Sequence, residues 1–166
     1  MIWGYDMEIR NIRGDIHNVN GCLGCNLSDG TLETFGGILY RDDDFNVSQD
    51  YELPINGFII IATNKHIVSI NELSKEQRYK LIELENRIIE LLKSYGISNN
   101  YRIIFEEKNH FHVWLMPEHS WMKDIGKPIY NIKEIFDYAK NNLRTLDNLN
   151  DISETCKRLK KDLNGC

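Results

Sequence analysis

The chain has 166 residues, of which 42% are hydrophobic and 27% are charged, and its formal net charge is −5. This length suits one domain with a sizeable core. The negative charge argues against binding a nucleic-acid polymer through a general positive field. A small nucleotide is still a possible partner, because it needs only a local site.

The sequence also bears on where the protein works. No apolar run approaches the length that spans a membrane, and residues 1–6 are too polar for a signal peptide. We therefore expect a cytoplasmic protein with no membrane partner. In a reducing cytoplasm, a Cys-x-x-Cys pair favours metal or redox chemistry over a structural disulfide.

The N-terminal segment, residues 1–19, shows no clear hydrophobic periodicity, and Asn and Gly are frequent in it. We predict an irregular arm here.

Cys22 and Cys25 follow this arm, and they have three readings: half of a zinc site, a redox pair, or two small residues in a turn. A redox pair usually follows a strand, and the preceding Asn-Val-Asn-Gly does not look like one. Tetrahedral zinc needs two more nitrogen or sulfur ligands. His66 and His110 are the candidates, because Cys156 and Cys166 belong to a separate C-terminal segment.

Three strands are predicted next. Residues 36–41 follow a glycine turn, residues 45–50 alternate, and residues 58–63 are continuously apolar, which is typical of a central strand. The acidic run 42–44 is interpreted as a solvated hairpin loop. It lacks the glycine and the later glutamate of a calcium loop.

A long amphipathic helix is predicted over residues 75–94. Ser74 and Gln77 match a capping box, apolar residues recur at helical spacing, and Gly96 ends the helix.

Residues 101–105 are rich in β-branched and aromatic side chains, and we predict a strand that continues through residues 110–117. Residues two apart on a strand share a face, so His110, His112 and Trp114 point one way and the residues between them point to a core. The two imidazoles then stand roughly 6–7 Å apart at the backbone, close enough to serve one phosphate or a metal and a phosphate. The plain alternative is two polar residues on an exposed face.

After a loop at 118–122, helices are predicted over residues 131–139 and 152–163. The basic run 157–161 is interpreted as a solvated helix face. Strands, a long helix, more strands and then helices predict an α+β domain with an antiparallel sheet.

At this point the residues resemble a known family, the histidine triad (HIT) nucleotide hydrolases and transferases. The family motif is His-x-His-x-His followed by two apolar residues and often proline. Residues 110–117 match it, with Trp114 in place of the third histidine. The related galactose-1-phosphate uridylyltransferases have glutamine at that position, so phosphoryl chemistry does not require a third histidine.

Two more motifs are similar to the zinc-containing bacterial-type branch of this family. That branch has a Cys-x-x-Cys near the start, here Cys22 and Cys25, and a Lys-His pair after the central strand, here Lys65 and His66. The resemblance covers about residues 20–122. It implies one structural zinc per chain, held by Cys22, Cys25, His66 and His110.

The resemblance also implies an architecture. We expect a HIT-like α+β fold with about five antiparallel strands, one long helix packed on them, and C-terminal helices. Residues 20–122 would be the catalytic domain and residues 123–166 a helical C-terminal extension. A homodimer is usual for the family.

The same resemblance implies a catalytic role for His112. It would attack the α-phosphorus of a nucleotide, and water would then hydrolyse the nucleotidyl-histidine. The residue suits the step, because a neutral imidazole is a good nucleophile near pH 7.

Five further residues are expected to contact substrate by the same resemblance. Asp50 would bind ribose hydroxyls. Leu27 and Leu39 would line the base pocket, with plain core packing as the alternative. Trp114 cannot accept a proton, and it would narrow the pocket or change the leaving group. Glu106 and its neighbour Glu107 stand where many members have Gln and Ser contacting phosphate; a carboxylate there repels phosphate unless it is protonated, paired or turned away.

Three functions are therefore open. The first is a hydrolase or nucleotidyltransferase that cleaves a dinucleoside polyphosphate, a nucleoside phosphoramidate or an adenylate. The second is a nucleotide-binding regulatory protein with little turnover. The third is a zinc-stabilised interaction domain.

Overall fold

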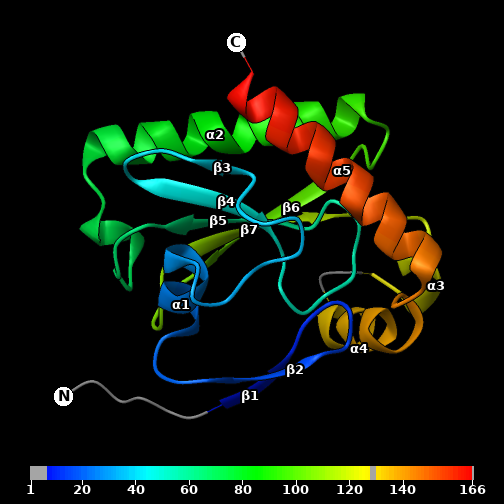
Figure 1. The fold of residues 1–166 in the computed structure, drawn as a ribbon. Helices are drawn as coiled ribbons and strands as arrows, with labels where there is room; N and C mark the ends of the chain where they lie inside the picture. Colours follow the sequence, from blue (N-terminus) through cyan, green and yellow to red (C-terminus); the bar gives the residue numbers. More distant parts are fainter. Residues whose placement is uncertain (1–6, 128–129, 166) are drawn as a thin grey trace.

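The computed structural model describes residues 7–127 and 130–165 (Figure 1). The strands are β1 (Met7–Arg10), β2 (Ile16–Val19), β3 (Tyr40–Arg41), β4 (Phe45–Gln49), β5 (Ile59–Thr63), β6 (Tyr101–Glu106) and β7 (His112–Pro117). The helices are α1 (Leu23–Asp29), α2 (Lys75–Ser94), α3 (Met122–Ile125), α4 (Ile132–Asn142) and α5 (Leu146–Asn164), with a 3-10 turn η1 (Ile70–Glu72).

A five-stranded sheet in the order β3-β4-β5-β7-β6 forms the centre of the fold, and all its neighbouring strands are antiparallel. The apolar run that we predicted to be a central strand is β5, which lies between β4 and β7. Strand β7, which begins at His112, lies between β5 and β6. The predicted α+β class and the five antiparallel strands are confirmed.

The long helix α2 covers one face of this sheet, and α4 lies on the other side (Figure 1). On the α2 side, Val113 and Leu115 of β7 join Leu81, Ile88 and Leu92 of α2 in the main core. On the α4 side, a second cluster is built from β7, β5 and their neighbours; its members include Phe58, Met116, Ile135 and Ala139. Alternation along β7 thus supplies both cores.

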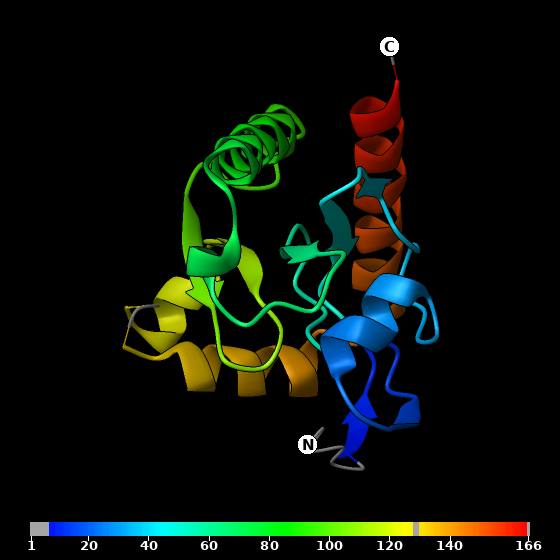
Figure 2. The same cartoon turned by 90° about the vertical axis from the view of Figure 1, so that its left-hand side faces the viewer.

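Helix α5 runs past the β3 end of the sheet and contacts both β3 and α2 (Figure 2). Ile152, Cys156 and Leu159 lie in the same core as α2. The C-terminal helices therefore complete the main core. The boundaries proposed at residues 20 and 122 stay a prediction.

The N-terminal arm is not irregular where the structure describes it. Strands β1 and β2 form an antiparallel hairpin, and the Oδ1 of Asn11 accepts hydrogen bonds from the backbone N–H groups of Arg13 (2.9 Å) and Asp15 (3.0 Å) in its turn. Only Ile9 and Val19 of this hairpin are buried among the described residues of the two strands. Two apolar anchors in short strands leave too weak a pattern for sequence reasoning to detect.

The prediction of one strand running from residue 101 through the His-x-His stretch was also wrong. The segment is a hairpin, in which β6 turns back into β7 and Glu106 pairs with His112. The turn contains Lys108, whose φ of 87° lies in the left-handed region. A lysine gives no sequence signal for that conformation, which glycine or asparagine usually adopts.

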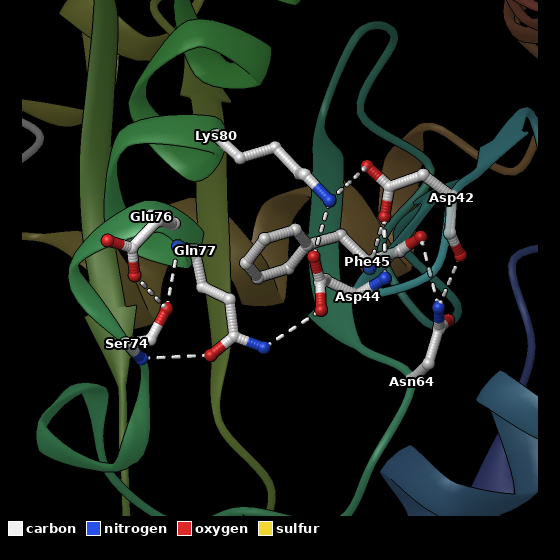
Figure 3. Close-up of polar contacts among 8 residues, drawn as sticks. All are labelled: Asp42, Asp44, Phe45, Asn64, Ser74, Glu76, Gln77 and Lys80. Atoms are coloured by element: carbon white, nitrogen blue, oxygen red, sulfur yellow. Dashed lines mark hydrogen bonds and ion pairs between the residues drawn. The ribbon is translucent and has the colours of Figure 1, made fainter.

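The acidic turn between β3 and β4 does more than face solvent (Figure 3). Asp44 accepts a hydrogen bond from Gln77 Nε2 (2.8 Å) and is paired with Lys80. Gln77 also belongs to the capping box of α2, where its Oε1 accepts from the N–H of Ser74 (2.8 Å). Asn64, at the end of β5, donates to the carbonyl oxygen of Asp42 (2.7 Å). The contacts of Asp44 with Gln77 and Lys80 tie the turn to the start of α2.

Other element boundaries moved by a few residues. The first sheet strand is only Tyr40–Arg41, and the last helix begins at Leu146 instead of residue 152. Helix α2 has the predicted limits. Within the described residues, no helix is both long and apolar enough to cross a membrane.

Candidate active site and metal centre

The Cys-x-x-Cys pair lies at the start of α1. Cys22 is the N-cap residue, and its Sγ accepts a hydrogen bond from the backbone N–H of Cys25 at 3.3 Å. Strand β2 precedes the pair and a helix begins at it, so our reason for ranking a redox pair low was wrong. The surroundings of the two thiols nevertheless favour a metal site.

Four potential metal ligands converge at this point. Cys25 Sγ lies 3.2 Å from His66 Nδ1, and both thiols lie 3.5 Å from His110 Nδ1. All four ligand atoms are within 4.8 Å of one another. Tetrahedral zinc would hold such atoms roughly 3.3–3.8 Å apart, from bonds of about 2.3 Å to sulfur and about 2.0 Å to nitrogen. The four residues that were predicted to form a metal site are therefore brought together.

His110 presents the correct ring nitrogen to the thiols. Its Nε2 lies 2.9 Å from the carbonyl oxygen of Thr63. A carbonyl oxygen can only accept, so Nε2 carries the hydrogen and Nδ1 carries the lone pair. A metal-binding histidine usually donates its other N–H in this way.

Burial sets the charge state of the cluster. It lowers the pKa of His110, so this imidazole is neutral at pH 7. Burial and hydrogen bonding with Cys22 raise the pKa of the Cys25 thiol to about 11. A divalent cation among these groups would reverse that balance and favour thiolates. The donor set of two thiols and two imidazoles fits zinc.

His112 lies on the strand that His110 leads into, and its ring is held at both nitrogens. Nδ1 lies 2.8 Å from the carbonyl oxygen of His110, and Nε2 lies 2.9 Å from the indole Nε1 of Trp114. The carbonyl can only accept and the indole can only donate. His112 is therefore neutral, with its hydrogen on Nδ1 and its lone pair on Nε2.

The acidic residues near this strand have different surroundings. Glu106 pairs with His112 across the β6–β7 hairpin, so the two side chains share a face of the sheet. Glu107 turns away, since its Oε1 accepts from the Ser69 hydroxyl and from the N–H of Ile70, both at 2.8 Å. These two bonds lower the pKa of Glu107.

Asp50 follows β4 and stabilises its own loop. Its Oδ1 accepts from the backbone N–H groups of Glu52 (2.9 Å) and Leu53 (2.7 Å), while burial raises its pKa to about 6. Its Oδ2 makes no hydrogen bond with the residues that the structure describes, so it is the atom that could contact ribose.

The two leucines expected at the base pocket differ. Leu39 is 1% exposed in the main core, which is the plain packing that we gave as the alternative. Leu27 is partly buried and packs with Ile9, Val19 and Tyr51. The N-terminal hairpin therefore lies against the residue expected to contact the base.

Sequence reasoning missed two residues that position the site. Thr63 supplies the carbonyl that orients His110, and its place at the end of the central strand was the only signal available. Phe136 of α4 contacts the indole of Trp114, with ring centroids 5.6 Å apart. No sequence pattern links a helix residue to a strand residue that precedes it by 22 positions.

Two surface hollows lie away from His112, although Thr63 is among the residues that line the second. One of about 330 Å³ lies between the β1–β2 turn and residues 31–36, and His17 and Tyr51 are among its lining residues. Another of about 220 Å³ lies near the acidic turn and Gln77. Neither is lined by His112, so the site is defined by its side-chain contacts.

Comparison with known proteins shows which fold this chain shares. No family model matches the chain. An uncharacterised HIT-like protein of Methanocaldococcus jannaschii is 22% identical over 112 residues, which are 64% of this chain and 85% of that protein. A zinc-bound histidine triad family protein from Mycobacterium smegmatis superposes with a TM-score of 0.58 at 13% identity, over 85% of this chain and 96% of the other.

The chain has a HIT-like fold. A Hit-like protein from Bartonella henselae, described as involved in cell-cycle regulation and as holding an unknown ligand, gives the same TM-score of 0.58 at 14% identity, over 84% of this chain and 93% of that one. In this fold β7 lies between β5 and β6, and the four candidate metal ligands gather near its start.

Proposed function

We propose that this protein is a HIT-type enzyme that cleaves the α-phosphate bond of a nucleotide through a nucleotidyl-histidine. The observation that carries the proposal is the state of His112. Its ring is neutral, its Nδ1–H donates to the carbonyl oxygen of His110, and its lone pair is on Nε2. This is the form of imidazole that a nucleophile requires.

The reaction would proceed in two displacements. In the first, Nε2 of His112 forms a bond to the α-phosphorus while the bond to the leaving group breaks and that group departs with the electron pair. The ring gains positive charge, which the Nδ1–H bond to the His110 carbonyl oxygen stabilises (2.8 Å). In the second, water attacks phosphorus, the P–N bond breaks, and a nucleoside monophosphate leaves with His112 restored.

Substrate contacts are proposed for the residues around this ring. Asp50 Oδ2, which has no hydrogen-bond partner in the described part of the chain, would contact ribose hydroxyls, and Leu27 offers an apolar, partly buried surface to the base. Glu106 faces the same side as His112. Its charge would oppose a bound phosphate unless the carboxyl group is protonated or paired, so Glu106→Gln is expected to strengthen nucleotide binding.

Zinc is the proposed cofactor, about one per chain, with Cys22, Cys25, His66 and His110 as ligands. Bound there, the ion would be structural: it would join α1 and the loop after β5 to the start of β7. His110 precedes His112 by two residues, and it also supplies the carbonyl that orients the His112 ring. A displacement of His110 would therefore disturb the orientation of the His112 ring.

The direct experiment is to incubate the protein with an adenosine phosphoramidate and with a dinucleoside polyphosphate and to measure its intact mass. The expected result is the gain of one adenylyl group, mapped to His112 and absent in His112→Ala. His17→Ala, at a histidine of the N-terminal hairpin, is the matched control and should keep the mark. A protein that never gains the group and releases no monophosphate would contradict the enzyme.

Two other candidates share this experiment. Trp114 donates a hydrogen bond to the nitrogen of His112 that would attack phosphorus. This contact favours a nucleotide-binding regulatory protein with little turnover. Nucleotide binding without mark or product would support that function. Neither binding nor turnover would support a zinc-stabilised interaction domain.

We also propose a homodimer through the free edge of β6 and the adjacent face of α2. Ile103 and Phe105 on β6 are 45% and 47% exposed, and Tyr79 and Ile82 on α2 are 59% and 51% exposed. Large apolar side chains grouped at a sheet edge are typical of a protein interface. A reducing compartment such as the cytoplasm is part of the proposal, because Cys22 and Cys25 must stay reduced to bind metal.

A further inference from the structure

The indole of Trp114 occupies the nitrogen that the proposed reaction needs. Its Nε1 donates a hydrogen bond to Nε2 of His112 at 2.9 Å. An indole N–H has no acceptor capacity, so this contact can only engage the His112 lone pair. The other ring nitrogen, Nδ1, is used by the His110 carbonyl oxygen. His112 therefore has no free lone pair in this conformation.

Two phenylalanines contact the indole. The ring centroid of Trp114 lies 5.7 Å from that of Phe58, nearly edge-on at 80°, and 5.6 Å from that of Phe136. The two phenylalanine rings lie 6.0 Å apart, so the three rings form one cluster. Aromatic pairs at such distances are favourable beyond the area that they bury.

The contact with Phe136 links the C-terminal part of the chain to the nucleophile. Phe136 is on α4, which packs under the sheet (Figure 1), and it belongs to the same apolar cluster as Ile135 and Met116. Trp114 is on β7, next to the His112 that it contacts. Helix α4 is therefore connected to the nucleophile through two contacts, one between Phe136 and Trp114 and one between Trp114 and His112.

We propose that Trp114 is a positioning residue that keeps the attacking nitrogen of His112 occupied in the resting protein, and that Phe136 of α4 holds the indole in place. This inference rests on the proposed function of His112 as nucleophile. Attack on phosphorus requires the lone pair to leave the indole N–H, so substrate must displace Trp114 before bond formation. Helix α4 thereby sets how readily the nucleophile is released.

The size of the effect follows from the bond that must break. A net protein hydrogen bond corresponds to between about twofold and about tenfold in an equilibrium or a rate. Trp114→Phe keeps an aromatic ring against Phe58 and Phe136 but removes the N–H. The His112 ring should keep its orientation in this variant, because the Nδ1–H bond to the His110 carbonyl oxygen is untouched.

The first test measures His112 without any nucleotide. Diethyl pyrocarbonate carbethoxylates a neutral imidazole at its free lone pair, and peptide mass spectrometry gives the rate at each histidine. In Trp114→Phe the rate at His112 should rise by up to about tenfold, and in Phe136→Leu it should rise less, while His17 reacts at its wild-type rate in all proteins. An unchanged rate at His112 in a folded Trp114→Phe protein would overturn the proposal; an unchanged rate in Phe136→Leu would overturn the role of α4.

A second test does not need Trp114 to be replaced. The indole N–H of Trp114 should exchange slowly with solvent in the wild-type protein, by NMR, and about tenfold faster in His112→Ala, where its acceptor is gone. Trp121, which contacts His119 and not His112, is the internal control. Equal exchange of the Trp114 proton in both proteins would show that the hydrogen bond is not formed.

These readouts separate the inference from the enzyme itself. If carbethoxylation follows the expected order but no variant is ever adenylylated, the hold on His112 stands and the enzymatic function fails. Trp114→Phe could instead be carbethoxylated faster than the wild type but adenylylated no faster. In that case the displacement of Trp114 from His112 by substrate does not limit the reaction, and the proposed displacement step is wrong.

Discussion

Gly24 allows α1 to approach the ring of His110. A Cβ atom added at Gly24 would lie 2.4 Å from Cγ and 2.6 Å from Cβ of that histidine, closer than real Cβ atoms come. Position 24, the second of the two residues between the cysteines, therefore has a packing reason to be glycine, since helix α1 and the segment that leads into β7 meet there. This close approach brings the thiols within reach of His110 Nδ1.

We predict that Gly24→Ala weakens zinc binding. The added methyl group must push the His110 ring or the helix away, and displacing the support of a metal ligand typically costs about ten- to a hundredfold in affinity. Competition with a chromophoric chelator measures the zinc affinity, and circular dichroism checks that α1 and the sheet remain. Affinity equal to that of the wild type would contradict the idea that this contact positions His110.

Removal of zinc should destabilise the fold. A ligand that binds only the folded state stabilises it by about 4 kcal/mol when present at a thousand times its dissociation constant. We expect a chelator to lower the melting temperature of the wild type and to have no effect on Cys22→Ser, which lacks a ligand. Cys156→Ala is the matched control, because Cys156 is a buried thiol in a different part of the core. It should keep about one zinc per chain and its chelator response; loss of zinc there instead would count against the assigned ligand set.

Much of this site was predictable because its signals are local. The limits of α2 follow from the Ser74–Gln77 capping box and from its apolar stripe. The four candidate metal ligands were expected from the resemblance of short motifs to a known family, and the structure brings them together. Side-chain alternation predicted that Val113 and Leu115 are buried while His112 is only partly covered. The capping box and the alternation each involve residues that are close in sequence, whereas the candidate metal ligands come from three separate segments.

What was not predictable depends on contacts between distant segments. The hairpin of β1 and β2 is stabilised by packing on Tyr51 and Leu27 rather than by its own pattern. The turn before β7 places Lys108 in a left-handed conformation, and its backbone N–H donates to the carbonyl oxygen of Val68 (2.8 Å). The indole of Trp114, which bonds to His112, also packs on Phe136 of another element. The hydrophobic periodicity of the sequence does not indicate any of these contacts between distant segments.

The apolar edge gives a prediction about assembly. Phe105→Glu places a charge on the proposed interface, which includes Tyr79, Ile82, Ile103 and Phe105, and dimerisation would bury that charge without a partner. We expect the variant to sediment as a monomer at concentrations where the wild type is a dimer. Ile16→Glu is the control: Ile16 is also large and exposed but lies on the N-terminal hairpin. A dimeric Phe105→Glu protein would show that the interface does not include this surface.

The contacts between the acidic turn and the start of α2 should contribute measurably to the free energy of unfolding (Figure 3). Gln77→Ala removes both its capping bond to Ser74 and its bond to Asp44. Loss of a capping interaction and one hydrogen bond costs about 1–2 kcal/mol. Urea unfolding measures the change, and Glu83→Ala, at an exposed position of the same helix, should shift the free energy of unfolding by no more than about 0.5 kcal/mol. Equal effects of the two substitutions would show that the hydrogen bonds of Gln77 contribute nothing to the free energy of unfolding.

Glu85 on α2 gives a pH dependence of stability. It is 5% exposed, its Oε1 has no hydrogen-bond partner among the described groups, and burial raises its pKa from 4.5 to about 7. The folded protein therefore holds this proton more tightly than the unfolded chain, so its contribution is fully present below the unfolded pKa and is lost as the pH rises through the folded one.

Replacing this carboxyl group should remove that loss. Glu85→Gln is expected to be more stable than the wild type above pH 7, by on the order of 1 kcal/mol, which is less than the full pKa change because solvent still reaches part of the group. The difference should disappear about one pH unit below 4.5, where Glu85 is protonated in both the folded and the unfolded state. Urea unfolding across this range measures it, with Glu83→Gln as an exposed control that should follow the wild type at every pH. A constant difference between Glu85→Gln and wild type would mean that the carboxyl group does not titrate as its burial requires.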